Sequence, residues 1–205
     1  SWNMSILKLM REHPRELIGG ALVALQDVDG AIREMEWARE NGFRAVILDK
    51  VFPVLDHCYS DPFGSHRELW PFFKRAAEMR MPLFLHNIQH GHRITNLMNY
   101  QLNGLDVLAP QEGQMSLVSL ITSGLLDDYP DLNFVFTEAG VAFIKPLVAH
   151  LNAWFDNSVV DYESEDAAPR FNYRKLAGGK RIVSAADYKS KNRQAPDYYF
   201  RKNFF

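Results

Sequence analysis

Residues 81–87 read MPLFLHN, a short apolar run that ends in a histidine and an asparagine. Residues 132–140 read LNFVFTEAG and repeat this design, because a second apolar run leads to Glu138. Runs of this length are typical of strands buried in a parallel sheet. In sheets and barrels of alternating strands and helices, functional groups gather where the strands end. We therefore expect His86 and Glu138 to lie at a functional site.

Working outward from these runs, strands and helices are expected to alternate along most of the chain. The predicted strands cover residues 17–25, 43–48, 81–86 and 132–137, and the predicted helices follow them within residues 29–42, 65–80, 114–126 and 144–154. Helices are also expected over residues 5–12 and 198–205, and connections over residues 52–64 and 90–110, the latter with room for a short helix. This alternation predicts an α/β fold with a parallel sheet and right-handed crossovers.

The crossover helices carry end signals and apolar stripes. Asp29 is expected to cap the first and Gly42 to close it, and Ser65 with Glu68 forms a capping box for the second. Apolar residues three or four positions apart predict one buried stripe on each of three helices. The stripes are Ala31, Met35 and Ala38 in the helix within residues 29–42, Met115, Val118, Ile121 and Leu125 in that within residues 114–126, and Ile144, Leu147, Leu151 and Trp154 in that within residues 144–154.

The composition is that of an ordinary globular protein. The 205 residues are 47% apolar and 23% charged, which predicts a single domain over residues 1–205, or part of a larger one. Residues 156–195 are polar, with an acidic cluster and then a basic one, and are expected to form a surface excursion within that domain. A net charge of −2 without a basic block predicts no binding to nucleic acid.

Compartment signals are few. Cys58 is the single cysteine, so an internal disulfide is excluded and a reducing compartment is favoured. No apolar run reaches the roughly 18 residues that a membrane helix needs. Residues 1–4 lack the charged-then-apolar pattern of a secretory signal. The chain is therefore expected to be cytoplasmic and to bind no membrane.

His86 and Glu138 are the leading candidates for chemistry. An imidazole at a strand end suits a metal ligand or a general base, and the alternative is a core histidine that is hydrogen-bonded to the backbone. A carboxylate at the edge of an apolar layer needs a partner, because burying it unpaired is costly. Glu138 is therefore expected to bind a metal, a cation or a substrate, or to act as an acid or base. The alternative for Glu138 is an ion pair with Lys50 or Arg93.

Other polar residues near the strand ends are weaker candidates. Asp49, at the end of the preceding strand, and Asn87, next to His86, are expected to bind substrate, although Asp49 can equally form an ion pair with Lys50. The pair His90 and His92 imitates metal-ligand spacing but lies in a predicted loop, where such short motifs carry little weight. Nucleophile elbows and phosphate-binding loops are absent from the sequence, so neither nucleophilic catalysis nor nucleotide binding is predicted.

Several stretches, which together extend over nearly the whole chain, carry a resemblance to a known family. Residues 82–86, 121–136 and 138–143, and also residues 22–42 and 195–200, resemble the amidohydrolase-2 family, which includes the aminocarboxymuconate-semialdehyde decarboxylase-like enzymes. The phrase SGLLDDYPDLNFVF at residues 123–136 is the most specific part of the resemblance. This family implies a metal-dependent TIM barrel of eight strand–helix units, of which about four central units correspond to this chain.

The resemblance also assigns roles to the two candidates. His86 corresponds to the metal ligand on the fifth barrel strand, and Glu138 stands where the sixth strand usually carries a histidine. The H-x-H pair of the first strand and the aspartate of the eighth strand have no counterparts in this sequence. The remaining ligands would come from a longer polypeptide or from another chain, or else the protein is a degenerate half-barrel.

The resemblance implies a metal-dependent enzyme, acting as a homo-oligomer such as a dimer, that hydrolyses or non-oxidatively decarboxylates a small carboxylated or cyclic metabolite. A divalent metal is the expected cofactor, with zinc as the default. Hydrolysis without metal, with Glu138 as the base, is a second enzymatic possibility. The alternative outside catalysis is a half-barrel scaffold or binding partner that another chain completes.

Overall fold

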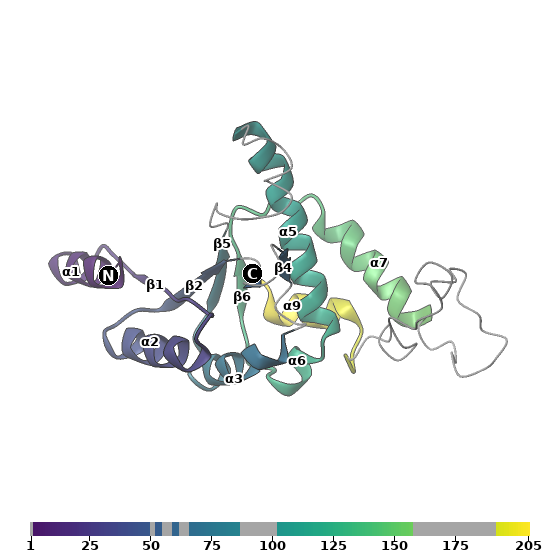
Figure 1. The fold of residues 1–205 in the computed structure, drawn as a ribbon. Helices are drawn as coiled ribbons and strands as arrows, with labels where there is room; N and C mark the ends of the chain where they lie inside the picture. The colour runs from purple at the N-terminus through teal and green to yellow at the C-terminus, as the bar shows by residue number, and fades with distance from the viewer. Residues whose placement is uncertain (1, 50–51, 55–58, 62–65, 87–101, 158–191) are drawn as a thin grey trace.

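The centre of the molecule is a parallel four-stranded sheet with the order β1–β2–β5–β6 (Figure 1). The structure is a computed structural model that describes residues 2–49, 52–54, 59–61, 66–86, 102–157 and 192–205. The strands of the sheet are β1 (Gly20–Leu22), β2 (Ala45–Asp49), β5 (Leu83–His86) and β6 (Phe134–Phe136). A parallel sheet with helical crossovers confirms the α/β prediction.

Helices connect the strands and cover the sheet. They are α1 (Trp2–Glu12), α2 (Val28–Glu40), the 3-10 helix η2 (Arg67–Leu69), α3 (Trp70–Glu78), α5 (Leu102–Thr122), α6 (Leu125–Asp128), α7 (Ile144–Asn157) and α9 (Pro196–Asn203). Figure 1 shows α2, α3 and α6 below the sheet in that view, with α5 and α9 beside β6. A parallel sheet needs such helices, because each strand must return to the starting edge before the next one begins.

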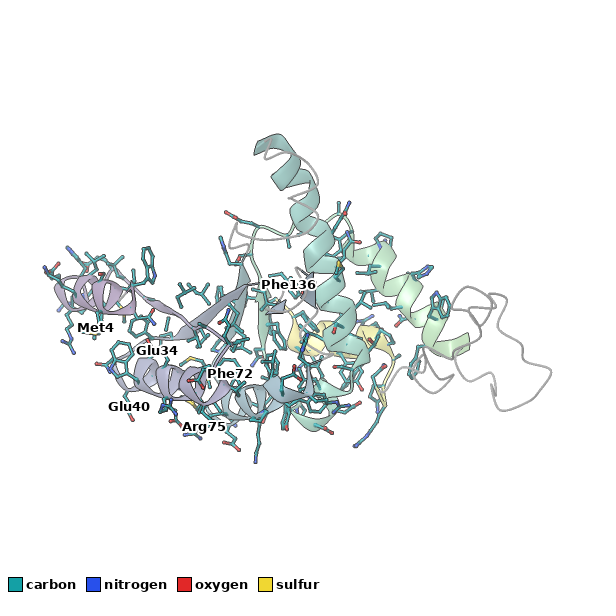
Figure 2. All side chains as sticks on the ribbon, in the orientation of Figure 1. Met4, Glu34, Glu40, Phe72, Arg75 and Phe136 are labelled. Atoms are coloured by element: carbon teal, nitrogen blue, oxygen red, sulfur yellow. The ribbon has the colours of Figure 1, made fainter. Side chains whose placement is uncertain are left out.

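The two faces of the sheet differ in burial. Val46, Leu83 and Phe134 are fully buried among apolar side chains of the helices. In Figure 2, Phe72 of α3 lies between its helix and the sheet, whereas Arg75 lies on the outer side. Residues of the opposite face, including Ile47, Phe84 and Val135, are only half-buried. In a closed barrel this second face would line the interior.

The helix α2 follows the predicted pattern except at its first residue. Ala31, Met35 and Ala38 are buried as their spacing predicted. The N-cap is Asp27, whose side chain accepts a 3.0 Å hydrogen bond from the backbone N–H of Gly30. The prediction of Asp29 as the cap was therefore wrong by two residues. Gly42 follows the helix with a φ of +88°, a conformation that glycine adopts without the clash a side chain would cause.

Several boundaries differ from the prediction. The strand expected over residues 17–25 is only the three-residue β1. The connection over residues 52–64 contains two short antiparallel strands, β3 (Phe52–Val54) and β4 (Tyr59–Asp61). The predicted connection over residues 90–110 is helical from residue 102 onward, because α5 begins there and has 21 residues. Glu68 contacts His66; the predicted capping box cannot be assessed, since Ser65 lies outside the described residues.

Two predicted stripes were partly wrong. In α5, Met115 is 40% exposed and Val118 is half-buried, and the residues that are buried there are Leu117, Leu120 and Ile121. The helix α5 carries apolar residues on more than one of its sides, so spacing alone does not identify the side that faces the core. In α7, Trp154 is 61% exposed, whereas Leu147 and Leu151 are partly buried and pack against the core.

Both lateral edges of the sheet carry hydrogen bonds from neighbouring segments. At β1, the Asn3 side chain of α1 accepts from the backbone N–H of Leu22 at 2.9 Å and donates to its carbonyl at 2.8 Å. At β6, Phe204 forms a parallel bridge with Phe134, and the backbone N–H of Phe205 donates to the Phe134 carbonyl at 2.9 Å. The segment after α9 therefore lies where the next parallel strand of a barrel would start.

Some predictions fall outside the described residues. These include Ser65, Cys58 and most of the polar excursion over residues 156–195. Among the helices of the described chain, none combines the length and apolar character needed to cross a lipid bilayer.

Candidate active site at the carboxyl ends of the strands

His86 is the last residue of β5 and lies on the half-buried face of the sheet. The strand alternates between buried Leu83 and Leu85 and half-buried Phe84 and His86. In the parallel ladder, Asp49 at the end of β2 is the register partner of His86. The structure therefore brings the backbone of two predicted site residues side by side at one edge of the sheet.

Glu138 reaches the same place from β6. Its Oε2 atom lies 3.4 Å from Nε2 of His86, and the two side chains are 72% and 41% exposed respectively. The structure thus brings together the two strand-end residues that the sequence analysis singled out, which are 52 positions apart in the sequence. The partners considered as alternatives, Lys50 and Arg93, lie outside the described residues.

The backbone conformation of Glu138 explains how its carboxylate reaches His86. Phe136 is the register partner of Leu85, so a regular strand would direct residue 138 to the face occupied by Leu85. Glu138 instead has a φ of +53°, in the left-handed region that side chains disfavour, and Gly140 follows with a φ of +66°. The strand therefore ends in a turn that breaks the alternation and returns the carboxylate toward His86.

The pair suits a divalent cation in its atoms. Imidazole nitrogen and carboxylate oxygen are both common ligands of transition-metal ions. Among the described side chains, no cluster of three or more His, Cys, Asp or Glu residues forms a ligand set. His86 can therefore supply one ligand at this edge of the sheet, with the Glu138 carboxylate beside it.

The other predicted site residues are not all described. Asn87, His90 and His92 lie in a segment outside the described residues, so their predicted roles stay predictions. A second histidine–carboxylate contact, between Nδ1 of His66 and Oε1 of Glu68 at 2.6 Å, lies on η2 and not at the end of a sheet strand. This hydrogen bond lowers the pKa of the Glu68 carboxyl below its ordinary value.

Comparisons with known proteins identify the family of this chain. The family model described as Amidohydrolase matches residues 3–188. The chain belongs to the amidohydrolase family. As an amidohydrolase, it shares its barrel architecture with proteins of that family, and its parallel sheet is part of a TIM barrel. The sequence-based prediction of this family and fold is confirmed.

Three relatives illustrate the likeness of this amidohydrolase to others. It is 24% identical over 184 residues to a gamma-resorcylate decarboxylase of Polaromonas sp. strain JS666, a match that covers 80% of this chain and 54% of that protein. The solved structure of a dihydroxybenzoic acid decarboxylase from Polaromonas sp. JS666, with bound manganese and the inhibitor 2-nitroresorcinol, has a TM-score of 0.66 at 20% identity. This match covers 99% of the present chain and 54% of that decarboxylase.

The third relative is a variant of 5-carboxyvanillate decarboxylase from Novosphingobium aromaticivorans DSM 12444, solved with bound manganese and 3-methoxy-4-hydroxy-5-nitrobenzoic acid. Its TM-score is 0.66 at 19% identity, with 99% of this chain and 50% of that chain covered. The amidohydrolase chain thus spans about half the length of the relatives that it matches.

Proposed function

We propose that this chain contributes His86 and Glu138 to the active site of a metal-dependent, non-oxidative decarboxylase of small carboxylated aromatic compounds. The observation that carries the proposal is the 3.4 Å contact between His86 Nε2 and Glu138 Oε2 at the carboxyl edge of the sheet. That edge is where barrel enzymes place their catalytic groups. The named activities of the matched relatives support the substrate class.

In this proposal His86 is a metal ligand and Glu138 is an acid or base beside it. When bound, a divalent cation supplies positive charge that orients an anionic substrate. His86 stands at the end of a hydrogen-bonded strand, which restricts where its imidazole can lie. A ligand whose position is restricted in this way favours metal binding. Asp49, the register partner of His86, is proposed to contact the substrate, as is Asn87.

Decarboxylation requires a proton at a defined atom. The bond between the ring carbon and the carboxylate carbon breaks, carbon dioxide leaves, and the ring carbon takes up one proton. A protonated Glu138 carboxyl can donate that proton and then recover one from water, since its side chain is 72% exposed. Hydrolysis, the other reaction expected from the sequence, has no comparable support among the named relatives.

The metal is proposed to be divalent. Two of the matched structures contain manganese, which makes Mn²⁺ the first ion to test. The zinc expected from the sequence stays a prediction, because a histidine and a carboxylate accommodate either ion.

Binding of Mn²⁺ to the 205-residue chain tests the ligand role of His86. We expect His86→Ala to weaken binding at least about 100-fold, because a first-row ion loses one of its few protein ligands. The matched control is His150→Ala, an exposed histidine of α7 whose Nε2 accepts a hydrogen bond from Trp154. Equal binding by the native chain and His86→Ala would contradict the proposal.

Turnover tests the role of Glu138. Release of carbon dioxide from 2,6-dihydroxybenzoate and 5-carboxyvanillate would be measured with Mn²⁺ present. We expect Glu138→Gln to lower kcat by about 10²- to 10⁴-fold, because the amide cannot transfer the proton. The control is Glu40→Gln, on the outer side of α2 in Figure 2. Activity of Glu138→Gln equal to that of the control would contradict an acid or base role.

A further inference from the structure

The residues that immediately precede His86 and Glu138 are tied together by two hydrogen bonds. The carbonyl oxygen of Leu85 accepts from the backbone N–H of Thr137 at 3.1 Å and from its Oγ1 hydroxyl, also at 3.1 Å. A carbonyl oxygen has two lone pairs and can accept both donors. The backbone N–H bond continues the ladder between the strands, and the hydroxyl bond is a second link that only a serine or threonine can make from this position.

This second link lies where the backbone changes direction. Glu138, the next residue, has the left-handed φ of +53° that brings its carboxylate to His86. A side-chain-bearing residue keeps such a conformation only where its surroundings hold it. Thr137 is the last residue before the turn, so its hydroxyl bond links the chain to β5 directly before the change of direction.

The helix α5 supports the turn from the other side. Ala139 is 3% exposed and packs against Gly113 of α5. A Cβ atom on Gly113 would lie 3.2 Å from the Cβ of Ala139 and 3.6 Å from the ring of Phe136, so the missing side chain permits this close approach. The turn is therefore held between β5, through Thr137, and α5, through Ala139.

We propose that Thr137 is a positioning residue, whose hydroxyl holds the Glu138 carboxylate beside the His86 imidazole. The inference rests on the proposed function, in which His86 binds the metal. It assigns Thr137 no contact with metal or substrate. Its effect passes through the Leu85 carbonyl, one residue before His86, and through the turn at Glu138.

The test compares three substitutions in the 205-residue chain. Thr137→Val removes the hydroxyl with little change in shape, and Thr137→Ser restores the donor. Thr122→Val is the matched control, because the Thr122 hydroxyl also donates to a backbone carbonyl, that of Val118 at 2.8 Å, but within α5. Two quantities are measured: the affinity for Mn²⁺ alone, and the ¹⁵N chemical shift of His86 Nε2 in the metal-free protein.

We expect Thr137→Val to weaken Mn²⁺ binding about tenfold, as outer residues that orient ligands commonly do. The same substitution should move the Nε2 signal of His86. Thr137→Ser and Thr122→Val should keep the Mn²⁺ affinity within twofold of the native value and leave the Nε2 signal unshifted. An unmoved His86 signal with native affinity in Thr137→Val would overturn the proposal. Equal losses in Thr137→Val and Thr137→Ser would also overturn it, because the methyl group and not the hydroxyl would then matter.

Failure of the proposed function can be distinguished from failure of this inference. If the native chain shows no measurable Mn²⁺ binding, the metal role of His86 is not supported, but the metal-free His86 signal still decides whether Thr137 positions the pair. If Thr137→Val does not fold, the comparison of Thr137→Ala with Thr137→Ser tests the same hydroxyl.

Discussion

The hydroxyl of Tyr199 donates a 2.5 Å hydrogen bond to Oδ1 of Asp127, joining α9 to α6 across 72 residues of sequence. The same hydroxyl accepts hydrogen bonds from the backbone N–H groups of Arg193 at 3.1 Å and Gln194 at 2.9 Å. The other Asp127 oxygen, Oδ2, accepts from the Arg193 N–H at 2.8 Å. Tyr199 is only 1% exposed, so this network anchors the segment that leads into α9 and onward to the edge of β6.

Substitution of Tyr199→Phe should destabilise the fold by about 1–3 kcal/mol. The phenyl ring keeps the packing but leaves Asp127 and the Gln194 N–H without this partner. The measurement is the free energy of unfolding in urea. Tyr198→Phe is the control, because Tyr198 is the neighbouring residue and is 47% exposed. Equal stability of the two variants would show that the buried network contributes nothing.

Stability should fall at alkaline pH through the same tyrosine. Burial, and then the hydrogen bond to Asp127, raises the pKa of Tyr199 to about 12 from its ordinary 10.0. The folded state therefore holds the proton to higher pH than the unfolded chain does. The resulting stabilisation, about 2–3 kcal/mol, is complete below pH 10 and is lost as the pH rises toward 12.

The pH effect is measured as the difference between the native chain and Tyr199→Phe in urea unfolding from pH 8 to pH 12. Subtraction removes the contributions of the lysines and of the other tyrosines. The difference should shrink above pH 10. Parallel curves for the two proteins over this range would contradict the assignment to Tyr199.

Substitution of Asn203→Asp should cost about 3 kcal/mol or more. Asn203 is 1% exposed, and its Nδ2 donates to the carbonyls of Leu132 at 2.6 Å and Pro130 at 3.2 Å. An ionised carboxylate has no hydrogen to donate and would face two carbonyl oxygens in a buried site. Unfolding in urea at pH 7 measures the loss. The control is Asn133→Asp, since the Asn133 amide makes a similar bond to the Asp131 carbonyl at an exposed position, and a cost as large there would contradict the role of burial.

Substitution of Asn3→Ala should lower stability by about 1–3 kcal/mol and expose the edge of β1. The Asn3 amide satisfies both backbone groups of Leu22 and also donates to Glu34 at 2.6 Å. An unprotected strand edge can pair with another chain, so self-association should increase with concentration. Urea unfolding and light scattering measure the two effects. Lys8→Ala, on the exposed side of the same helix, should change neither, and an Asn3→Ala variant that behaves like it would refute the edge-capping role.

Local patterns predicted the elements whose surroundings are simple. Ala31, Met35 and Ala38 are buried because α2 has one apolar stripe, and spacing identifies a single stripe without further information. Met115 was misplaced because α5 has apolar residues on more than one side. Trp154 was misplaced because spacing alone does not show which residues of α7 meet other elements: Asn152 accepts a hydrogen bond from the backbone N–H of Asp197 in α9, whereas Trp154 is 61% exposed.

The sequence by itself determined the order of strands and helices and the arrival of His86 and Glu138 at strand ends, because strand length and side-chain alternation are local properties. It did not predict the role of Thr137, although a hydroxyl directly before the predicted acid was a visible signal. Only the tertiary structure decided the 3.4 Å spacing of the pair. That spacing depends on the register of β5 with β6 and on the left-handed turn at Glu138. Both arise from hydrogen bonds and packing between residues far apart in the chain, where the Thr137 hydroxyl meets the Leu85 carbonyl and Ala139 meets Gly113.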